Sequence, residues 1–334
     1  MEFGNRFSRE VDMPVPIVQI RNLTKIYIRD VIGTEFGRLK IRLKNRKVAA
    51  LKSLTLDVNE GEIFGLLGPN GAGKTTVIKI LMGLIFPTSG FATLMGKPLG
   101  DKSVKASIGF LPENPYFYDY LKGYEFLNYY GQLYGMGAER RRRKIPELLE
   151  LVGLTSAADL PLKGYSKGML QRIGLAQALL NDPKIVFLDE PQSGLDPFGR
   201  KEVRDLILSL KERGSTVFFS SHILSDAEVI CDRVAILSKG ALVNVGALDE
   251  ILSARIKAYE IEAMDIPEAL VSELEKISVQ FVRRAKTLLF IIEKEDLAEQ
   301  AVKRIINSPG HLVSYAPRRE TLEEYFIRNI EKQQ

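Results

Sequence analysis

The sequence predicts an α/β protein whose first domain is built on a mostly parallel sheet, and three observations support this class. Short apolar runs rich in β-branched residues recur at 62–67, 184–190, 215–222 and 233–240. Helix-like segments separate these runs, an alternation typical of a parallel sheet covered on both faces. A glycine-rich loop directly follows the first run, where nucleotide-binding α/β sheets place a phosphate.

The composition is that of a globular protein with room for two domains. Of the 334 residues, 45% are apolar and 27% are charged, and the net charge of +5 does not by itself demand a polyanionic partner. No apolar run approaches the roughly 18–20 residues that would span a bilayer. The start, MEFGNRFSREVD, lacks the apolar core of a secretion signal, so we expect a cytoplasmic protein. The single cysteine, Cys231, lies in an apolar stretch and is predicted to be core.

The changes of pattern along the chain predict its domain boundaries. An N-terminal extension of 1–16 precedes a first domain at 17–250. Within this domain, about 29–47 is an insertion and about 114–181 is a helical subdomain. A small α/β domain is expected to occupy 251–334.

The first part of the chain is predicted to be mainly strands. The segment 17–28 is rich in β-branched residues, and a strand at 54–58 is expected to turn at Asn59–Gly61 into the strand at 62–67. A helix should start near Lys74, after the glycine loop.

Helices dominate the middle of the chain. A helical region is predicted at 124–181, with breaks at 135–138, Pro146 and 160–164. Further helices are expected over about 198–212 and from about 224, between the later strands of the parallel sheet.

The second domain has its own alternation of strands and helices. The pattern is compatible with a ferredoxin-like α/β domain. Its predicted elements are a strand at 257–264, a helix at 267–277, strands at 278–284 and 287–293, a helix at 296–307, a strand at 311–317 and a helix at 321–332.

The run GPNGAGKTT at 68–76 is predicted to bind the phosphates of a nucleotide. It fits the GxxxxGK[ST] spacing between a buried-looking strand and an apolar helix. Glycines let the backbone turn its N–H groups toward phosphate oxygens, and the helix N-terminus adds a positive dipole end. Lys74 would reach the β- and γ-phosphates, and Thr75 would hold Mg²⁺. The expected nucleotide-binding residues are Gly68, Asn70, Gly71, Ala72, Gly73, Lys74, Thr75 and Thr76.

A second apolar strand, IVFLDE at 185–190, ends in two adjacent carboxylates. Asp189 fits the Mg²⁺-side acid that accompanies a phosphate loop. Glu190 is predicted to point elsewhere because side chains alternate along a strand. That would leave Glu190 free to accept a proton from an attacking water. An ordinary acidic strand end is the alternative.

Taken in order, the motifs of 17–245 resemble those of the nucleotide-binding subunits of ATP-binding cassette (ABC) transporters. After the phosphate loop, GFLPEN at 109–114 occupies the Q-loop position and YSKGM at 165–169 occupies the signature position. The acidic strand, SGLD at 193–196 as the D-loop and His222 as the switch histidine complete the order. Several motifs in one order are far more specific than any one of them.

The resemblance implies a P-loop NTPase fold, namely an ABC ATPase domain with a parallel core sheet, an antiparallel β-subdomain and a helical subdomain. It also implies an ATPase that converts ATP to ADP and phosphate, with ATP and Mg²⁺ held in a head-to-tail, nucleotide-sandwich dimer. The small C-terminal domain resembles the short accessory domain of some export-type subunits.

Particular residues acquire roles from this resemblance. Tyr27 would stack on adenine, while Ser166 and the Gly168 backbone would contact the γ-phosphate bound by the opposite subunit. His222 would hydrogen-bond that phosphate and orient the water, and Asp196 would lie at the dimer seam. The implied catalytic residues are Lys74, Glu190, His222 and Asp196, and the implied Mg²⁺ ligands are Thr75, Glu113 and Asp189.

Two positions depart from the family pattern. The Q-loop usually has glutamine, and Glu113 would add negative charge beside the triphosphate while still offering an oxygen to Mg²⁺. We therefore expect a retained metal contact with altered hydrolysis or coupling. The signature is usually LSGGQ, and here Lys167 and Met169 replace a glycine and the glutamine. A lysine there puts in question any contact that needs a positive φ, but such variants resemble export-type members and are not interpreted as loss of activity.

The resemblance also implies partners that this chain does not contain. Separate membrane subunits should dock at about 113–135, which includes the aromatic segment 116–134. Tyrosine and phenylalanine favour such interfaces, led here by Tyr116, Phe117 and Tyr118. The alternative is that these rings simply pack the helical subdomain. A second ATP-binding subunit, identical or homologous, completes the assembly on the inner face of the cell membrane.

We therefore predict the ATP-hydrolysing subunit of an ABC transporter, with export favoured. One alternative is an ATP-dependent regulator or tether of a membrane complex. The other is a soluble ABC ATPase that acts on nucleic acid or ribosomes. Such proteins usually carry long coiled-coil insertions, zinc-binding cysteines or two cassettes in one chain, and the sequence has none of these, so no nucleic acid partner is expected.

The basic run RLKIRLKNRK at 38–47 belongs to the insertion between Tyr27 and Val48. We predict an added hairpin, with Gly33 or Gly37 near its turn. Its charges would face water, a partner or anionic lipid, or the nucleotide. Alternation would put Arg38, Lys40, Arg42, Lys44 and Arg46 on one face and Leu39, Ile41 and Leu43 on the other.

Overall fold

A computed structural model describes residues 16–31, 34–35, 38–39, 44–253 and 256–331. The chain divides into two compact units, Met1–Gly246 and Ala247–Gln334. The helix α8 (Leu248–Ser253), which the sequence pattern did not predict, falls in the second unit. Within the described ranges, no helix is long and apolar enough to cross a membrane.

The core of the first unit is a six-stranded sheet in the order β12-β11-β5-β10-β9-β8. The strands β5, β9 and β10 are buried along their whole length, as their apolar runs predict. Because neighbouring strands from β8 to β11 are parallel, the loops after β5, β9 and β10 meet at one edge of the sheet. The strands are β5 (Ile63–Leu67), β8 (Ile108–Leu111), β9 (Ile185–Asp189), β10 (Thr216–Ser221), β11 (Arg233–Ser238) and β12 (Ala241–Ala247).

The strands β5, β9 and β10 are each followed by a helix. The helices begin close to the predicted positions, and each starts near the edge where the strands end. These helices are α1 (Lys74–Leu81), α6 (Pro197–Glu212) and α7 (Leu224–Ile230).

An antiparallel sheet in the order β4-β1-β6-β7 forms the second layer of the first unit. Its buried residues, with those of α1 and the core sheet, form one continuous apolar cluster. The strands β6 to β8, the short helix α2 (Lys102–Lys105) and β12 were not predicted, and β6 shows why: half of its residues are exposed. The strands of this sheet are β1 (Val18–Val31), β4 (Lys44–Val58), β6 (Ser89–Leu94) and β7 (Lys97–Pro98).

The basic insertion is a hairpin in its described residues, as predicted. The strands β1 and β4 stay paired as far as Val31 and Lys44. Beyond them, β2 (Thr34–Glu35) pairs with β3 (Arg38–Leu39). The predicted turn glycines, Gly33 and Gly37, lie outside the described residues. So do residues 40–43, the middle of the predicted alternation of basic and apolar side chains.

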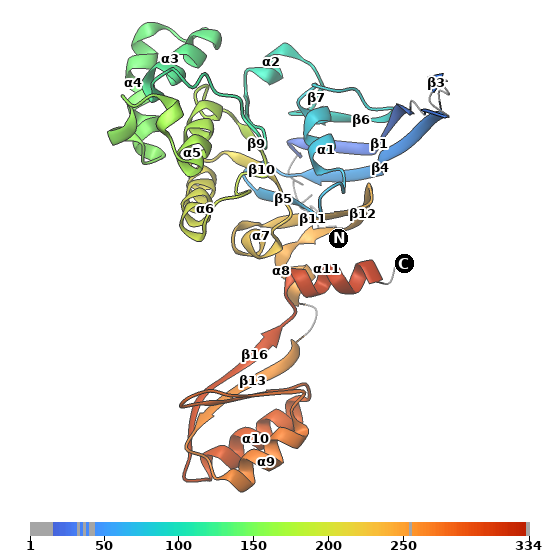
Figure 1. The fold of residues 1–334 in the computed structure, drawn as a ribbon, viewed down its shortest axis with the longest axis vertical. Helices are drawn as coiled ribbons and strands as arrows, with labels where there is room; N and C mark the ends of the chain where they lie inside the picture. Colours follow the sequence, from blue (N-terminus) through green and yellow to red (C-terminus); the bar gives the residue numbers. More distant parts are fainter. Residues whose placement is uncertain (1–15, 32–33, 36–37, 40–43, 254–255, 332–334) are drawn as a thin grey trace, which may run out of the picture. The chain divides into compact units, whose positions relative to one another are not determined.

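The helical subdomain contains α3 (Gly123–Leu133), α4 (Ala138–Leu151) and α5 (Lys167–Ala178). In the first unit, α3 and α4 lie at the end away from β1 and β4 (Figure 1). The predicted break at Pro146 is wrong, because α4 continues through it. Pro146 is exposed while Ile145, Leu148 and Leu149 are buried, so the packed face keeps the helix intact despite one missing backbone donor.

Cys231 is buried beside β5, as predicted for a core residue. Burial, and secondarily the charge of Asp232, raises the pKa of its thiol well above the ordinary value. The thiol is therefore protonated at neutral pH and unsuited to act as a nucleophile.

The second unit contains a βαββαβ succession followed by α11. Its sheet is antiparallel in the order β14-β15-β13-β16, with α9 and α10 packed on its own apolar core. This is the predicted ferredoxin-like arrangement. The elements are β13 (Ile256–Met264), α9 (Glu268–Ile277), β14 (Gln280–Arg283), β15 (Leu288–Ile292), α10 (Glu295–Ile306), β16 (His311–Arg319) and α11 (Leu322–Glu331).

Candidate functional site

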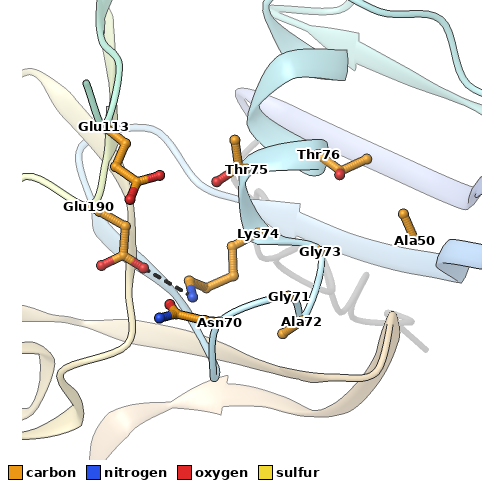
Figure 2. A pocket seen from close by; sticks show the side chains of 10 residues that line it. All are labelled: Ala50, Asn70, Gly71, Ala72, Gly73, Lys74, Thr75, Thr76, Glu113 and Glu190. Atoms are coloured by element: carbon orange, nitrogen blue, oxygen red, sulfur yellow. Dashed lines mark ion pairs between the residues drawn. The ribbon is translucent and has the colours of Figure 1, made fainter. Parts of the chain in front are cut away.

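The glycine loop between β5 and α1 lines a cavity of about 340 Å³ (Figure 2). Gly68 and Gly73 have φ values of 150° and 110°, which favour glycine. A Cβ on Gly68 would lie 2.2 Å from the Leu237 carbonyl oxygen, and one on Gly73 would lie 2.5 Å from that of Ala50. The cavity, called the phosphate cavity below, is lined by Ala50, Asn70, Gly71, Ala72, Gly73, Lys74, Thr75, Thr76, Glu113 and Glu190.

Lys74 is folded back into this loop. Its ammonium group donates to the Gly68 carbonyl at 2.7 Å and to the Pro69 carbonyl at 3.3 Å. It also forms an ion pair with Glu190 at 3.0 Å, drawn as the dashed line in Figure 2. Both side chains of this pair are buried. A buried cation thus sits where the loop's backbone amides would receive a phosphate, which is the arrangement that a phosphate loop requires.

Asp189 ends β9 and accepts two hydroxyl hydrogen bonds on one oxygen. Thr75 Oγ1 lies 3.1 Å and Ser220 Oγ lies 2.6 Å from Asp189 Oδ1. Burial raises the pKa of the Asp189 carboxyl above its usual value, and these two hydrogen bonds partly offset the rise. A hydroxyl and a carboxylate oxygen this close are the kind of donors that Mg²⁺ prefers.

We predicted that side-chain alternation along a strand would turn Glu190 away from Asp189, and this reason is wrong. The strand β9 ends at Asp189, and Glu190 has a left-handed backbone with φ of 51°, so simple strand alternation no longer applies. Its N–H donates to Ser220 Oγ at 3.0 Å. Ser220, which the sequence motifs did not single out, therefore connects the two neighbouring acids. Only its place two residues before His222 could have pointed to it.

His222 meets Glu190 just beyond the end of β10. Its Nδ1 lies 2.7 Å from Glu190 Oε2, while the other oxygen of that carboxylate faces Lys74. One carboxylate therefore joins the phosphate loop to the histidine that we predicted to be the switch histidine. The structure brings together Lys74, Thr75, Asp189, Glu190 and His222.

Glu113 also lines the phosphate cavity, and its side chain points into it in Figure 2. In the described part of the chain, no group of three or more His, Cys, Asp or Glu residues could hold a metal ion. A Mg²⁺ here would depend on the Thr75 hydroxyl and on substrate phosphates as well as carboxylates, which is the usual manner of Mg²⁺ in phosphate-loop sites.

Residues 166–168 of the predicted signature and 194–196 of the predicted D-loop line a second cavity, of about 420 Å³. Ser166 caps α5 by accepting the Met169 N–H at 3.2 Å, and Asp196 caps α6 by accepting the Gly199 N–H at 2.7 Å. Lys167 is the first residue of α5 and does not have a positive φ, so the backbone here does not require the glycine that lysine replaces. This signature cavity is lined by Ser166, Lys167, Gly168, Arg172, Gly194, Leu195, Asp196, Phe198, Gly199 and Glu202, and it shares no residue with the phosphate cavity.

Tyr27 does not line the phosphate cavity. It lies on β1 opposite Val48, and the Lys25 ammonium is 5.1 Å from its ring centroid. The ring therefore already has a cation–π partner. Adenine stacking by Tyr27 stays a prediction.

The aromatic segment after Glu113 contains both exposed rings and a ring packed inside the subdomain. Tyr116 and Tyr120 are 83% and 70% exposed. Phe117, in contrast, packs on Phe126 with ring centroids 5.4 Å apart. Packing within the subdomain is therefore confirmed for Phe117. Docking of a membrane partner stays a prediction, and Tyr116 has the exposed ring that it would need.

Comparisons with known proteins identify the family that this chain resembles. A family model described as ABC transporter matches residues 51–193. The chain is 47% identical over 296 residues to an uncharacterised ABC transporter ATP-binding protein of Synechocystis sp., covering 86% of this chain and 80% of the relative. It is 30% identical over 315 residues to Nod factor export ATP-binding protein I of Cupriavidus metallidurans, covering 93% and 96%. A dimeric ATP-binding cassette in a post-hydrolysis state, bound to ADP and Pi, is similar with a TM-score of 0.59 and 27% identity, covering 69% of this chain and 98% of that one.

Proposed function

The chain belongs to the ABC transporter ATP-binding proteins, a family of ATPases, and on that premise we propose that it drives export through separate membrane subunits. The observation that carries the ATP-hydrolysing part of this proposal is the position of Glu190. One buried carboxylate touches both the phosphate-loop lysine and the switch histidine. Lys74 and His222 are the two groups that would contact the phosphates of a bound ATP.

The proposed reaction starts with an exchange of partners at Lys74. ATP phosphates take the place of Glu190 beside the Lys74 ammonium, because they carry more negative charge and meet the loop's N–H groups as well. Glu190 then lies free to accept a proton from the attacking water. His222 keeps its hydrogen bond to Glu190 and orients the Glu190 carboxylate.

Mg²⁺ is part of the proposal. Thr75 and Asp189 would hold it, since their oxygens lie 3.1 Å apart at the edge of the phosphate cavity, and Glu113 lines the same cavity. When bound, Mg²⁺ neutralises negative charge on the β- and γ-phosphates. Ser220 keeps Asp189 in place by its hydrogen bond.

We further propose that each nucleotide is held by two copies of the cassette. Ser166, Gly168 and Asp196 lie in a cavity that contains no residue of the phosphate loop in its own chain. A head-to-tail pair would bring this signature cavity over the phosphate cavity of the opposite subunit. The similar structure that is dimeric with ADP and Pi supports this arrangement.

The proposed membrane partner docks on about 113–135. Tyr116 and Tyr120 present large exposed rings there, and aromatic side chains are enriched in protein interfaces. The direction of transport rests on the similar protein named for Nod factor export. The protein would then work on the inner face of the cell membrane, without nucleic acid.

Substituting Glu190 by glutamine tests the reaction. Glu190→Gln should keep ATP affinity within a few-fold but lower turnover by roughly 100-fold or more, because glutamine cannot accept the proton. Glu150→Gln, at an exposed position of α4, is the matched control and should turn over normally. Wild-type turnover by Glu190→Gln would contradict the assignment of the base.

Affinity purification from membranes tests the partner. An integral membrane protein should co-purify with the chain, and Tyr116→Ser with Tyr120→Ser should weaken the association. RNA or DNA that co-purifies without any membrane protein would overturn the transporter proposal. A membrane complex that shows no ATP-dependent transport would favour the tether or regulator instead.

A further inference from the structure

Two segments of the helical subdomain that are far apart in sequence are tied together by backbone hydrogen bonds. One follows Glu113 and leads into α3, and the other leads into the signature serine, Ser166. Lys122 and Pro161 form an antiparallel bridge between them. The bonds run from Lys163 N–H to Asp119 O (2.8 Å), Leu162 N–H to Leu121 O (2.8 Å), Gly123 N–H to Leu160 O (3.3 Å) and Tyr124 N–H to Ala158 O (3.0 Å).

Tyr165 lies at the end of this junction, immediately before Ser166. Its side chain is buried, at 7% exposed, and its hydroxyl donates to the Ala157 carbonyl at 2.7 Å. Burial, and secondarily the charge of Asp159, raises the pKa of the Tyr165 hydroxyl, so it stays protonated as a donor. The leucine of the usual LSGGQ pattern could fill the space but could not make this bond.

The segment that leads into α3 leaves room for the same hydroxyl at Gly123. A Cβ built on Gly123 would lie 2.3 Å from Tyr165 Oη and 3.4 Å from the ring carbon that carries it. Gly123 is the first residue of α3 and does not have a positive φ, so its backbone does not require glycine. What requires glycine at 123 is the tyrosine hydroxyl.

We propose that Tyr165 is a positioning residue whose hydroxyl, seated against Gly123, fixes the residues around Ser166 to the start of α3, which directly follows the segment 116–122. Since Ser166 directly follows Tyr165, the depth at which the ring sits sets the position of the α5 N-terminus. A displacement of 116–122, where the membrane partner is proposed to dock, would then reach Ser166 through this contact. This inference rests on the proposed function, because it assigns Ser166 to the γ-phosphate of the opposite subunit.

Three variants of the full chain test the contact through ATP turnover. Gly123→Ala should lower turnover by roughly 10–100-fold, because the new methyl displaces the tyrosine. Tyr165→Phe should lower it by about three- to tenfold, the effect of one hydrogen bond. The double variant should be no worse than Tyr165→Phe alone, because removing the hydroxyl frees the space for the methyl. ATP affinity should stay within about twofold in all three.

The rescue in the double variant separates positioning from general loss of structure. Gly137→Ala is the matched glycine control, since an added Cβ there meets nothing within 4 Å, and it should turn over normally. Effects of Gly123→Ala and Tyr165→Phe that simply multiply, or a parallel loss of ATP affinity, would overturn the inference.

Ser166→Ala distinguishes failure of the inference from failure of the proposed function. If Ser166→Ala leaves turnover unchanged, the composite site itself is wrong. If Ser166→Ala loses turnover but the double variant shows no rescue, the composite site stands and the role of Tyr165 falls.

Discussion

The two cavities of the first unit differ in how their charges are satisfied. In the phosphate cavity, Lys74 is buried and bound to two carbonyls and to Glu190, which in turn reaches His222. In the signature cavity, Lys167 is exposed, and among the described residues it forms no ion pair. The buried charges of the first cavity are therefore paired within the chain, whereas the second presents two helix N-termini and, in the described structure, a lysine without an ion pair, beside the Arg172–Glu202 pair. In our proposal, the first cavity binds the nucleotide of its own chain and the second contacts the nucleotide of a second copy.

Lys74→Ala should have the largest effect, because it alters the paired charges of the phosphate cavity. The substitution removes the buried cation, so Glu190 loses its ion pair with Lys74 and keeps only the contact with His222 on its side chain. We expect ATP affinity to fall by roughly 100-fold or more, the usual scale for losing a buried charge contact. Titration with a fluorescent ATP analogue measures this, with Lys79→Ala on the exposed face of α1 as the control. Unchanged affinity would contradict the assignment of the phosphate loop.

Ser166→Ala should affect turnover instead of affinity. The serine lines the signature cavity and caps α5, so it does not contact a nucleotide in its own phosphate cavity. Turnover should fall by roughly 10–100-fold while the affinity of the single chain for ATP stays within about twofold. A matching fall in affinity would mean that the two cavities are not independent.

Ser220→Ala tests how the phosphate cavity is held. The serine is fully buried and joins Asp189 to the backbone of Glu190, so its removal leaves both groups short of one partner. We expect the free energy of unfolding to fall by about 1–3 kcal/mol. Turnover should fall about tenfold, with a higher Mg²⁺ requirement for ATP binding. Ser225→Ala, at an exposed position of α7, is the control, and an equal effect there would remove the special role of Ser220.

Lys167→Ala should have the smallest effect. The side chain is exposed and reaches toward Gly194 without an ion pair in the described structure. Turnover should change by less than about threefold, since exposed charges contribute little. A loss of tenfold or more would show that this lysine carries part of the phosphate contact across the dimer.

The sequence was sufficient for those features that depend on local patterns. The glycine loop, the two acids at the end of β9 and the βαββαβ succession of the second unit all follow from spacing and apolar periodicity. The helix through Pro146 was missed because its packed face outweighs one lost hydrogen bond. The strand β6 was missed because its first three residues are exposed and show no apolar pattern.

The parts of the site that sequence could not give depend on contacts between distant segments. The left-handed Glu190 and its link through Ser220 require β9 and β10 to be neighbours. The fit of Tyr165 against Gly123 joins residues 42 positions apart in the sequence, with no local signal in either. Such contacts are set by packing and not by propensity.

The association state of Glu190→Gln with ATP tests the central claim most directly. Sedimentation should show a dimer with ATP and Mg²⁺, and the same variant carrying Ser166→Ala should bind ATP but sediment largely as a monomer. That result would mean that the signature cavity of one chain recognises the nucleotide of another. ATP-bound Glu190→Gln that stays monomeric, or equal dimerisation with and without Ser166, would contradict the account.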